Sequence, residues 1–143
     1  MRRPQLRGQQ FALFLGRLHY KKGLDYLAGA WAKVATEVPD ASLVVAGPDE
    51  GALAPFEAQI ARAKVAERVH IVGPLYGEEK FAALVDAACF CLPSRQEGFS
   101  VAVLEALACG VPVIMSEACH FAEAAAPVTG PAGRWRVKTC GNG

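Results

Sequence analysis

Residues 97–108 read Glu-Gly-Phe-Ser-Val-Ala-Val-Leu-Glu-Ala-Leu-Ala and are the most informative part of the chain. This stretch places two carboxylates, Glu97 and Glu105, in a segment that is otherwise apolar. A carboxylate on a buried helix is costly unless it is paired or hydrogen-bonded. Glu105 is therefore expected to face either a buried cation or a ligand rich in hydroxyl groups, for which a ribose is suitable.

A helix is expected to begin near Ser100, because Ser is a favoured N-cap residue. Apolar residues, including Val101 and Leu104, surround this helix on all sides, and Glu105 is its only charge. An all-round apolar surface is typical of a buried helix. The pattern therefore predicts that the whole helix is buried.

The loop in front of this helix is predicted to bind an anion. Residues 93–98 leave the apolar strand 88–92 and lead into the N-terminus of the helix. A helix N-terminus below a glycine-containing loop binds phosphate through its backbone N–H groups and its dipole. Glu97 would oppose a phosphate, so it is expected to hold neutral hydroxyl groups beside it. Together with Glu105, the loop outlines a site for a nucleotide sugar.

These residues resemble a known family. From Pro93 to Ile114 the chain follows, with few departures, the E-x7-E motif of the retaining GT-B glycosyltransferases of family 4. The stretch from Gly16 to Gly23 is similar to the G-R-L-x-x-x-K-G pattern at the start of their C-terminal, donor-binding domain. Two motifs in this order are more specific than one motif alone.

The resemblance implies how the donor would be held. Arg17 and Lys22 would bind the diphosphate of a nucleotide diphosphate sugar, and Glu105 would bind its ribose. Leu75 and Lys80 would flank the nucleobase.

The resemblance also implies a catalytic residue, Glu97, which would orient the hydroxyl groups of the transferred sugar. Gly16 belongs to the first motif and is counted with the substrate-binding residues. The transferred sugar would further contact the backbone of Gly98, Phe99, Ser100 and Val101.

The residues themselves leave other interpretations open. Glu105 could instead form an ion pair with a structural Lys or Arg across a helix interface, although the whole motif favours a ligand. Arg17 and Lys22 could be solvated charges, although cations are unfavourable at the positive end of a helix dipole. Leu75 could cap the core, as apolar residues after strands often do.

Helix and strand patterns alternate along the chain, which predicts an α/β fold: a doubly wound, Rossmann-like parallel sheet with helices on both faces. By the resemblance, this is one half of a GT-B fold. Ligands of such sheets bind at the carboxyl ends of the strands. The predicted strands are 11–15, 42–46, 69–72, 88–92 and 112–115, and the predicted helices are about 24–38, 53–65, 78–87 and one from residue 100.

The 143 residues, 52% of them hydrophobic, suffice for one core. Residues 1–10 are expected to be a frayed N-terminal segment, 11–126 the donor-binding domain, and 127–143 a tail without assignment, although Trp135 and Val137 suit a last strand. The N-terminal acceptor domain of the family has no counterpart before Arg17. The chain looks clipped at both ends and is expected to bind a donor without transferring its sugar.

Composition argues against several classes of protein. A net charge of +1 with mixed signs gives no sign of nucleic-acid binding or of contact with an anionic membrane. The five cysteines lack zinc spacing, and there is no Asp-x-Asp, so neither a metal nor another cofactor is predicted. An odd number of cysteines favours a cytoplasmic protein. The resemblance leaves open contact with the cytoplasmic membrane face through the absent domain.

Two other functions remain open at this point. The same residues would serve a noncatalytic nucleotide-sugar-binding module that regulates or scaffolds a partner. The chain could also be a folding fragment whose uncovered apolar surface promotes self-association. The sequence does not distinguish UDP, GDP and ADP as the nucleotide.

Overall fold

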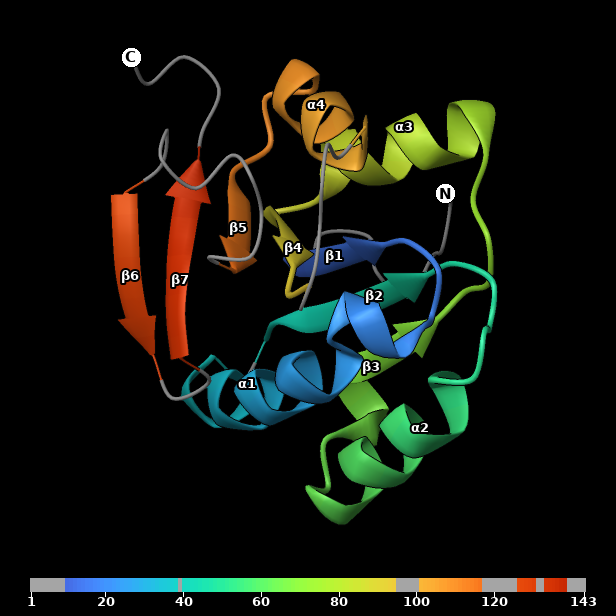
Figure 1. Cartoon of the computed structure of the whole chain (residues 1–143), viewed down its shortest axis with the longest axis vertical. Helices are drawn as coiled ribbons and strands as arrows, with labels where there is room; N and C mark the ends of the chain where they lie inside the picture. The colour runs from blue at the N-terminus through green and yellow to red at the C-terminus, as the bar shows by residue number, and fades with distance from the viewer. Residues whose placement is uncertain (1–9, 39, 95–100, 117–125, 131–132, 139–143) are drawn as a thin grey trace.

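The computed structural model describes residues 10–38, 40–94, 101–116, 126–130 and 133–138. Its strands are β1 Phe11–Leu15, β2 Ser42–Ala46, β3 Val69–Ile71, β4 Cys89–Leu92, β5 Val113–Ser116, β6 Ala126–Gly130 and β7 Gly133–Lys138. They form one sheet in the order β3-β2-β1-β4-β5-β7-β6 (Figure 1). β1 to β5 are parallel, whereas β7 pairs with β5 and β6 pairs with β7 in antiparallel orientation.

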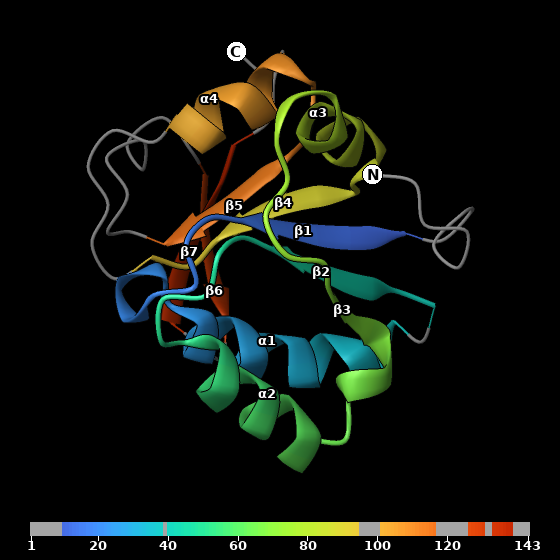
Figure 2. The ribbon, with the colours of Figure 1, turned by 90° about the vertical axis from the view of Figure 1, so that its right-hand side faces the viewer.

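The helices cover both faces of the parallel strands. They are α1 Leu24–Glu37, α2 Leu53–Arg62, α3 Gly77–Asp86 and α4 Val101–Ala108, with short 3-10 turns at Tyr20–Lys22 (η2) and Ala66–Arg68 (η3). α1 and α2 lie on one face, and α3 and α4 lie on the other (Figure 2). The doubly wound, Rossmann-like fold predicted from the sequence is confirmed.

The core consists of two layers, because successive strand residues point to opposite faces of the sheet. Leu13 of β1 and Phe90 of β4 pack with Leu84 of α3 on one side. Phe14 of β1 packs with Trp31 of α1 on the other side. Apolar residues therefore fill both faces of the central strands, as buried parallel strands require.

Two strands near the C-terminal end of the chain, β6 and β7, belong to the sheet. β7 confirms the strand expected around Trp135 and Val137, and its backbone pairs Trp135 with Ser116 of β5. β6 was not expected, because Pro127 and Gly130 are poor strand formers. It lies at the edge of the sheet, where a proline is tolerated since one side of the strand needs no ladder hydrogen bonds.

The prediction that the helix after Ser100 is wholly buried is wrong. Val101 of α4 is 61% exposed and Leu104 is 41% exposed, while Val103 and Ala106 are fully buried. A helix that packs on one face of a sheet buries only the side that meets the strands, even where its other positions are also apolar. No helix in the described part of the chain is both long and apolar enough to cross a membrane.

Two free cysteines, Cys89 and Cys91, occupy alternate positions of β4. The hydrogen bond with the Cys91 thiol lowers the pKa of Cys89, although burial acts in the opposite direction. The same hydrogen bond and burial raise the pKa of Cys91 well above its ordinary value.

We expect iodoacetamide at neutral pH to label Cys89 before Cys91, because the thiolate is the reactive form and Cys89 loses its proton more easily. Peptide mass mapping over a time course measures both rates in one sample. Faster labelling of Cys91 would contradict this assignment.

Candidate functional site

The candidate site lies where the strand order reverses. The chain runs outward from β1 through β2 to β3 and then returns to place β4 on the other side of β1. In doubly wound sheets, ligands bind at the carboxyl ends of the strands at such a point. The loops that begin at Gly16 and Gly47 meet there.

Backbone contacts hold these loops close together. The Gly16 N–H donates to the Ala46 carbonyl at 3.0 Å, and the Gly47 N–H donates to the Gly73 carbonyl at 3.0 Å. A Cβ on Gly47 would lie 1.7 Å from the Gly16 carbonyl oxygen. Only glycine fits this close approach of the two loops.

A pocket with a volume of about 320 Å³ opens at this edge and is called the rim pocket. Its walls come from the ends of β1 and β2, the segment between β3 and α3, and the helices α3 and α4. Pockets for small ligands begin at roughly this size. The predicted site residues that line it are Gly16, Arg17, Leu75, Lys80 and Glu105, and those not predicted include Pro48, Tyr76 and Ala102.

Glu105 has a cation as its partner. Lys80 Nζ of α3 lies 2.8 Å from Glu105 Oε2 of α4, and the two side chains are 28% and 22% exposed. This is the ion pair across a helix interface that the sequence left open as one environment for Glu105. Because both side chains line the rim pocket, the pair also forms part of its wall.

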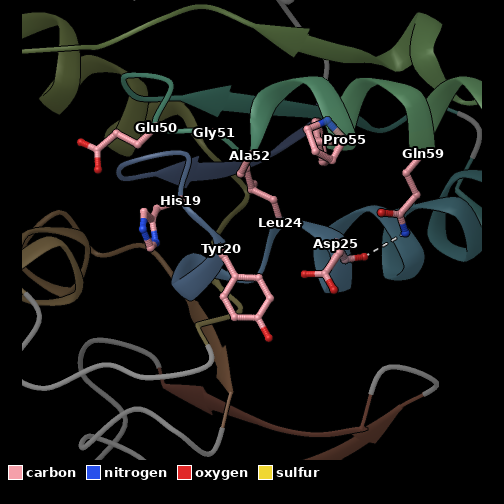
Figure 3. Close-up of a pocket in the computed structure, with 10 residues that line it drawn as sticks. His19, Tyr20, Leu24, Asp25, Glu50, Gly51, Ala52, Pro55 and Gln59 are labelled. Atoms are coloured by element: carbon pink, nitrogen blue, oxygen red, sulfur yellow. Dashed lines mark hydrogen bonds between the residues drawn. The ribbon is translucent and has the colours of Figure 1, made fainter.

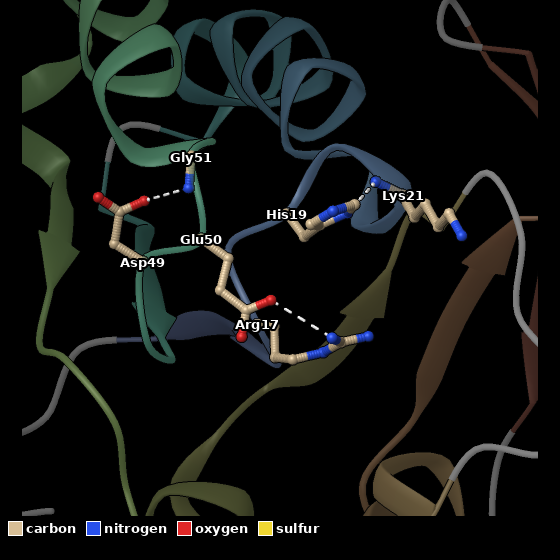
Figure 4. A network of polar contacts seen from close by, with 6 residues as sticks. All are labelled: Arg17, His19, Lys21, Asp49, Glu50 and Gly51. Atoms are coloured by element: carbon tan, nitrogen blue, oxygen red, sulfur yellow. Dashed lines mark hydrogen bonds and ion pairs between the residues drawn. The ribbon is translucent and has the colours of Figure 1, made fainter.

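Arg17 pairs with a residue that sequence reasoning missed. Its Nη1 donates to Glu50 Oε1 at 3.3 Å (Figure 4). Glu50 lies in the loop between β2 and α2. Its position just after a predicted buried strand, at the edge where ligands bind, was the signal that could have identified it.

The other predicted residues are not gathered in the rim pocket. Lys22 ends η2 and Val101 begins α4, and neither lines this pocket. Lys22 nevertheless lies beside Gly23, where a Cβ would be 1.9 Å from the Pro93 carbonyl oxygen. The end of the first motif, at Gly23, is therefore in contact with Pro93, where the second motif begins. The remaining predicted residues, Glu97, Gly98, Phe99 and Ser100, lie outside the described residues.

A second pocket, of about 370 Å³, lies beside η2 and the first turns of α1 and α2 (Figure 3). Leu24 and Phe56 are among its apolar lining residues, and Asp25, Glu50 and His19 are among its polar ones. Glu50 therefore lies between the two pockets, because its partner Arg17 lines the rim pocket. In the described part of the chain, no three His, Cys, Asp or Glu side chains are grouped to hold a metal.

Comparison with known families decides the membership of the chain. The family model for glycosyl transferases group 1 matches residues 2–130. The chain belongs to this family. The two motifs and the parallel strands β1 to β5 of this glycosyl transferase of group 1 lie within the matched residues.

Relatives with assigned activities are similar over most of this chain. A lipopolysaccharide core biosynthesis mannosyltransferase of Rhizobium meliloti is 31% identical over 80% of this chain and 33% of its own length. A GDP-mannose-dependent phosphatidylinositol monomannoside mannosyltransferase of Corynebacterium glutamicum is 32% identical over 80% of this chain and 31% of its own length. This group 1 chain thus spans about a third of the relatives that it matches.

Solved structures share its fold. A glycosyltransferase involved in lipopolysaccharide biosynthesis, WaaG, aligns with a TM-score of 0.72 at 26% identity, over 81% of this chain and 30% of its own length. The C-terminal domain of a group 1 glycosyl transferase from Francisella tularensis aligns with a TM-score of 0.68 at 22% identity, over 76% of this chain and 58% of its own. The chain thus has the Rossmann-like fold of a GT-B domain.

Proposed function

We propose that these residues form the donor-binding domain of a retaining glycosyltransferase of the family 4 type, which takes a nucleotide diphosphate sugar as its donor. The observation that carries the proposal is the rim pocket, which brings the first motif, through Gly16 and Arg17, together with the second, through Glu105. The GDP-mannose dependence named for the Corynebacterium relative supports a donor of this class.

In this proposal each wall of the pocket meets a different part of the donor. Arg17, assisted by Lys22, neutralises the diphosphate, which is the leaving group and gains charge as the glycosidic bond breaks. Glu105 accepts hydrogen bonds from the ribose hydroxyl groups, and Leu75 with Lys80 flanks the base. Since cationic side chains and the α4 N-terminus can stabilise the leaving group, the proposal needs no metal.

The transferred sugar belongs to the loop that leads into α4. Glu97 is proposed to orient the sugar hydroxyl groups so that the anomeric carbon faces a hydroxyl acceptor. Gly98, Phe99, Ser100 and Val101 supply backbone donors beside it. Transfer to the acceptor is proposed to require further residues such as the longer relatives carry, so the 143 residues alone should bind the donor without turnover.

We expect the purified chain to bind UDP or GDP in calorimetric titrations, and Arg17→Ala and Glu105→Ala each to weaken that binding roughly tenfold, as loss of a hydrogen bond to a charged group would do. Val85→Ala is a matched control, because Val85 is 64% exposed on α3 and does not line the rim pocket. Its affinity should equal that of the unsubstituted chain.

Lys80→Ala shows how much the ion pair contributes to stability. If Glu105 serves only its bond to Lys80, then Glu105→Ala should lower the unfolding midpoint as much as Lys80→Ala does and should leave the nucleotide affinity unchanged, which would contradict the proposed role of Glu105. A folded chain that binds none of UDP, GDP and ADP would refute the donor site. Nucleotide binding with no transfer after addition of a separate acceptor domain would instead favour a noncatalytic binding module.

A further inference from the structure

We propose that Glu50 is a positioning residue, whose carboxylate orders the Arg17 guanidinium at the edge of the rim pocket before a donor binds. The inference rests on the proposed function, in which Arg17 meets the donor diphosphate. It adds a residue from the β2–α2 loop, outside both motifs, to the donor site.

Backbone hydrogen bonds join the loop that carries Glu50 to Leu18, the residue after Arg17. The Leu18 N–H donates to the Pro48 carbonyl at 2.8 Å, and the Leu18 carbonyl accepts from the N–H groups of Glu50 and Ala52, both at 3.0 Å. Leu18 is only 1% exposed, so these bonds are anchored in the core. These hydrogen bonds between the two loops therefore fix the distance between the backbones of Arg17 and Glu50.

The neighbouring acidic residue, Asp49, binds backbone N–H groups instead of Arg17. Its Oδ1 accepts from the Gly51 N–H at 2.9 Å and from the Leu53 N–H at 3.3 Å. These bonds form the turn that leads into α2, while the Glu50 side chain extends toward Arg17 (Figure 4). The turn thus presents Glu50, rather than Asp49, to the guanidinium.

Ordering Arg17 in advance should help it to bind an anion. Its side chain is 59% exposed, and a long exposed side chain loses rotamer entropy when a ligand immobilises it. The contact with Glu50 engages Nη1, whereas a guanidinium has five N–H donors. Other N–H groups of Arg17 therefore remain free to bind a phosphate. Because Glu50 already restricts the Arg17 side chain, less rotamer entropy is lost when the donor binds. The negative charge of Glu50 opposes this gain, but solvent and salt screen it at a site this exposed.

A double-mutant cycle tests the proposal, with calorimetric titration of whichever of UDP and GDP binds the unsubstituted chain more tightly. Glu50→Ala should weaken binding about threefold to fivefold. Glu50→Gln keeps an acceptor for Arg17 and removes the repulsive charge, so it should bind at least as tightly as the unsubstituted chain. With Arg17→Ala already present, Glu50→Ala should weaken binding no further.

Glu57→Ala is the matched control, because it removes an exposed carboxylate from α2 without changing the Arg17 contact. Its affinity should be unchanged. Unchanged affinity in Glu50→Ala, or the same loss with and without Arg17, would overturn the positioning role while leaving the donor site intact. A folded chain that binds neither UDP nor GDP would overturn the proposed function and this inference together.

Discussion

Gly23→Ala is expected to destabilise the domain by about 3 kcal/mol or more, the sum of backbone strain and steric overlap at one position. Gly23 has a φ of 72°, in the left-handed region that residues with a Cβ avoid. The added Cβ would also lie 1.9 Å from the Pro93 carbonyl oxygen, which is backbone and has little freedom to move. Relief of this overlap would separate the start of α1 from the end of β4.

Urea unfolding monitored by circular dichroism measures this loss. Gly29→Ala is a matched control within α1, because Gly29 is exposed and the nearest atom to its added Cβ is Gln59 Nε2 at 4.0 Å. Alanine favours helices over glycine, so this control should gain about 0.5–1 kcal/mol. Equal midpoints for Gly23→Ala and the unsubstituted chain would show that the contact with Pro93 does not constrain the fold.

Phe90→Ala is expected to lower the free energy of unfolding by about 3–5 kcal/mol, as removal of a fully buried aromatic ring usually does. Phe90 is 0% exposed in β4, and its backbone neighbours across the sheet are Leu13 of β1 and Val113 of β5. The strands on both sides hold the backbone, so the cavity cannot close by collapse. Because whole domains are stable by only about 5–15 kcal/mol, much of the stability should be lost.

Phe81→Ala is the comparison for the same chemical change. Phe81 is 42% exposed on α3, and surface substitutions usually change stability by about 0.5 kcal/mol or less. Thermal unfolding of both variants should therefore show a large drop in midpoint for Phe90→Ala and a small one for Phe81→Ala. Similar drops for the two variants would mean that Phe90 does not occupy the packed centre of the sheet.

The site could be predicted from the sequence only in part. The two motifs identified Arg17 and Glu105, and the rule that ligands bind at strand ends brought their loops to one edge. The motifs and this rule did not indicate that Lys80 pairs with Glu105 or that Glu50 pairs with Arg17. Such pairs depend on how separate loops and helices pack, which local patterns do not encode.

Local signals, namely apolar strands between glycine and proline breaks, predict the helices α1 to α4, the parallel strands β1 to β5 and their alternation. Strands β1 and β2 have the bounds that these signals predict, Phe11–Leu15 and Ser42–Ala46. The strand order, the exposure of Val101 on α4 and the addition of β6 to the edge are seen in the folded chain alone. The physical reason is that burial and strand pairing arise from contacts between residues distant in the chain, whereas helix and strand periods arise from neighbours.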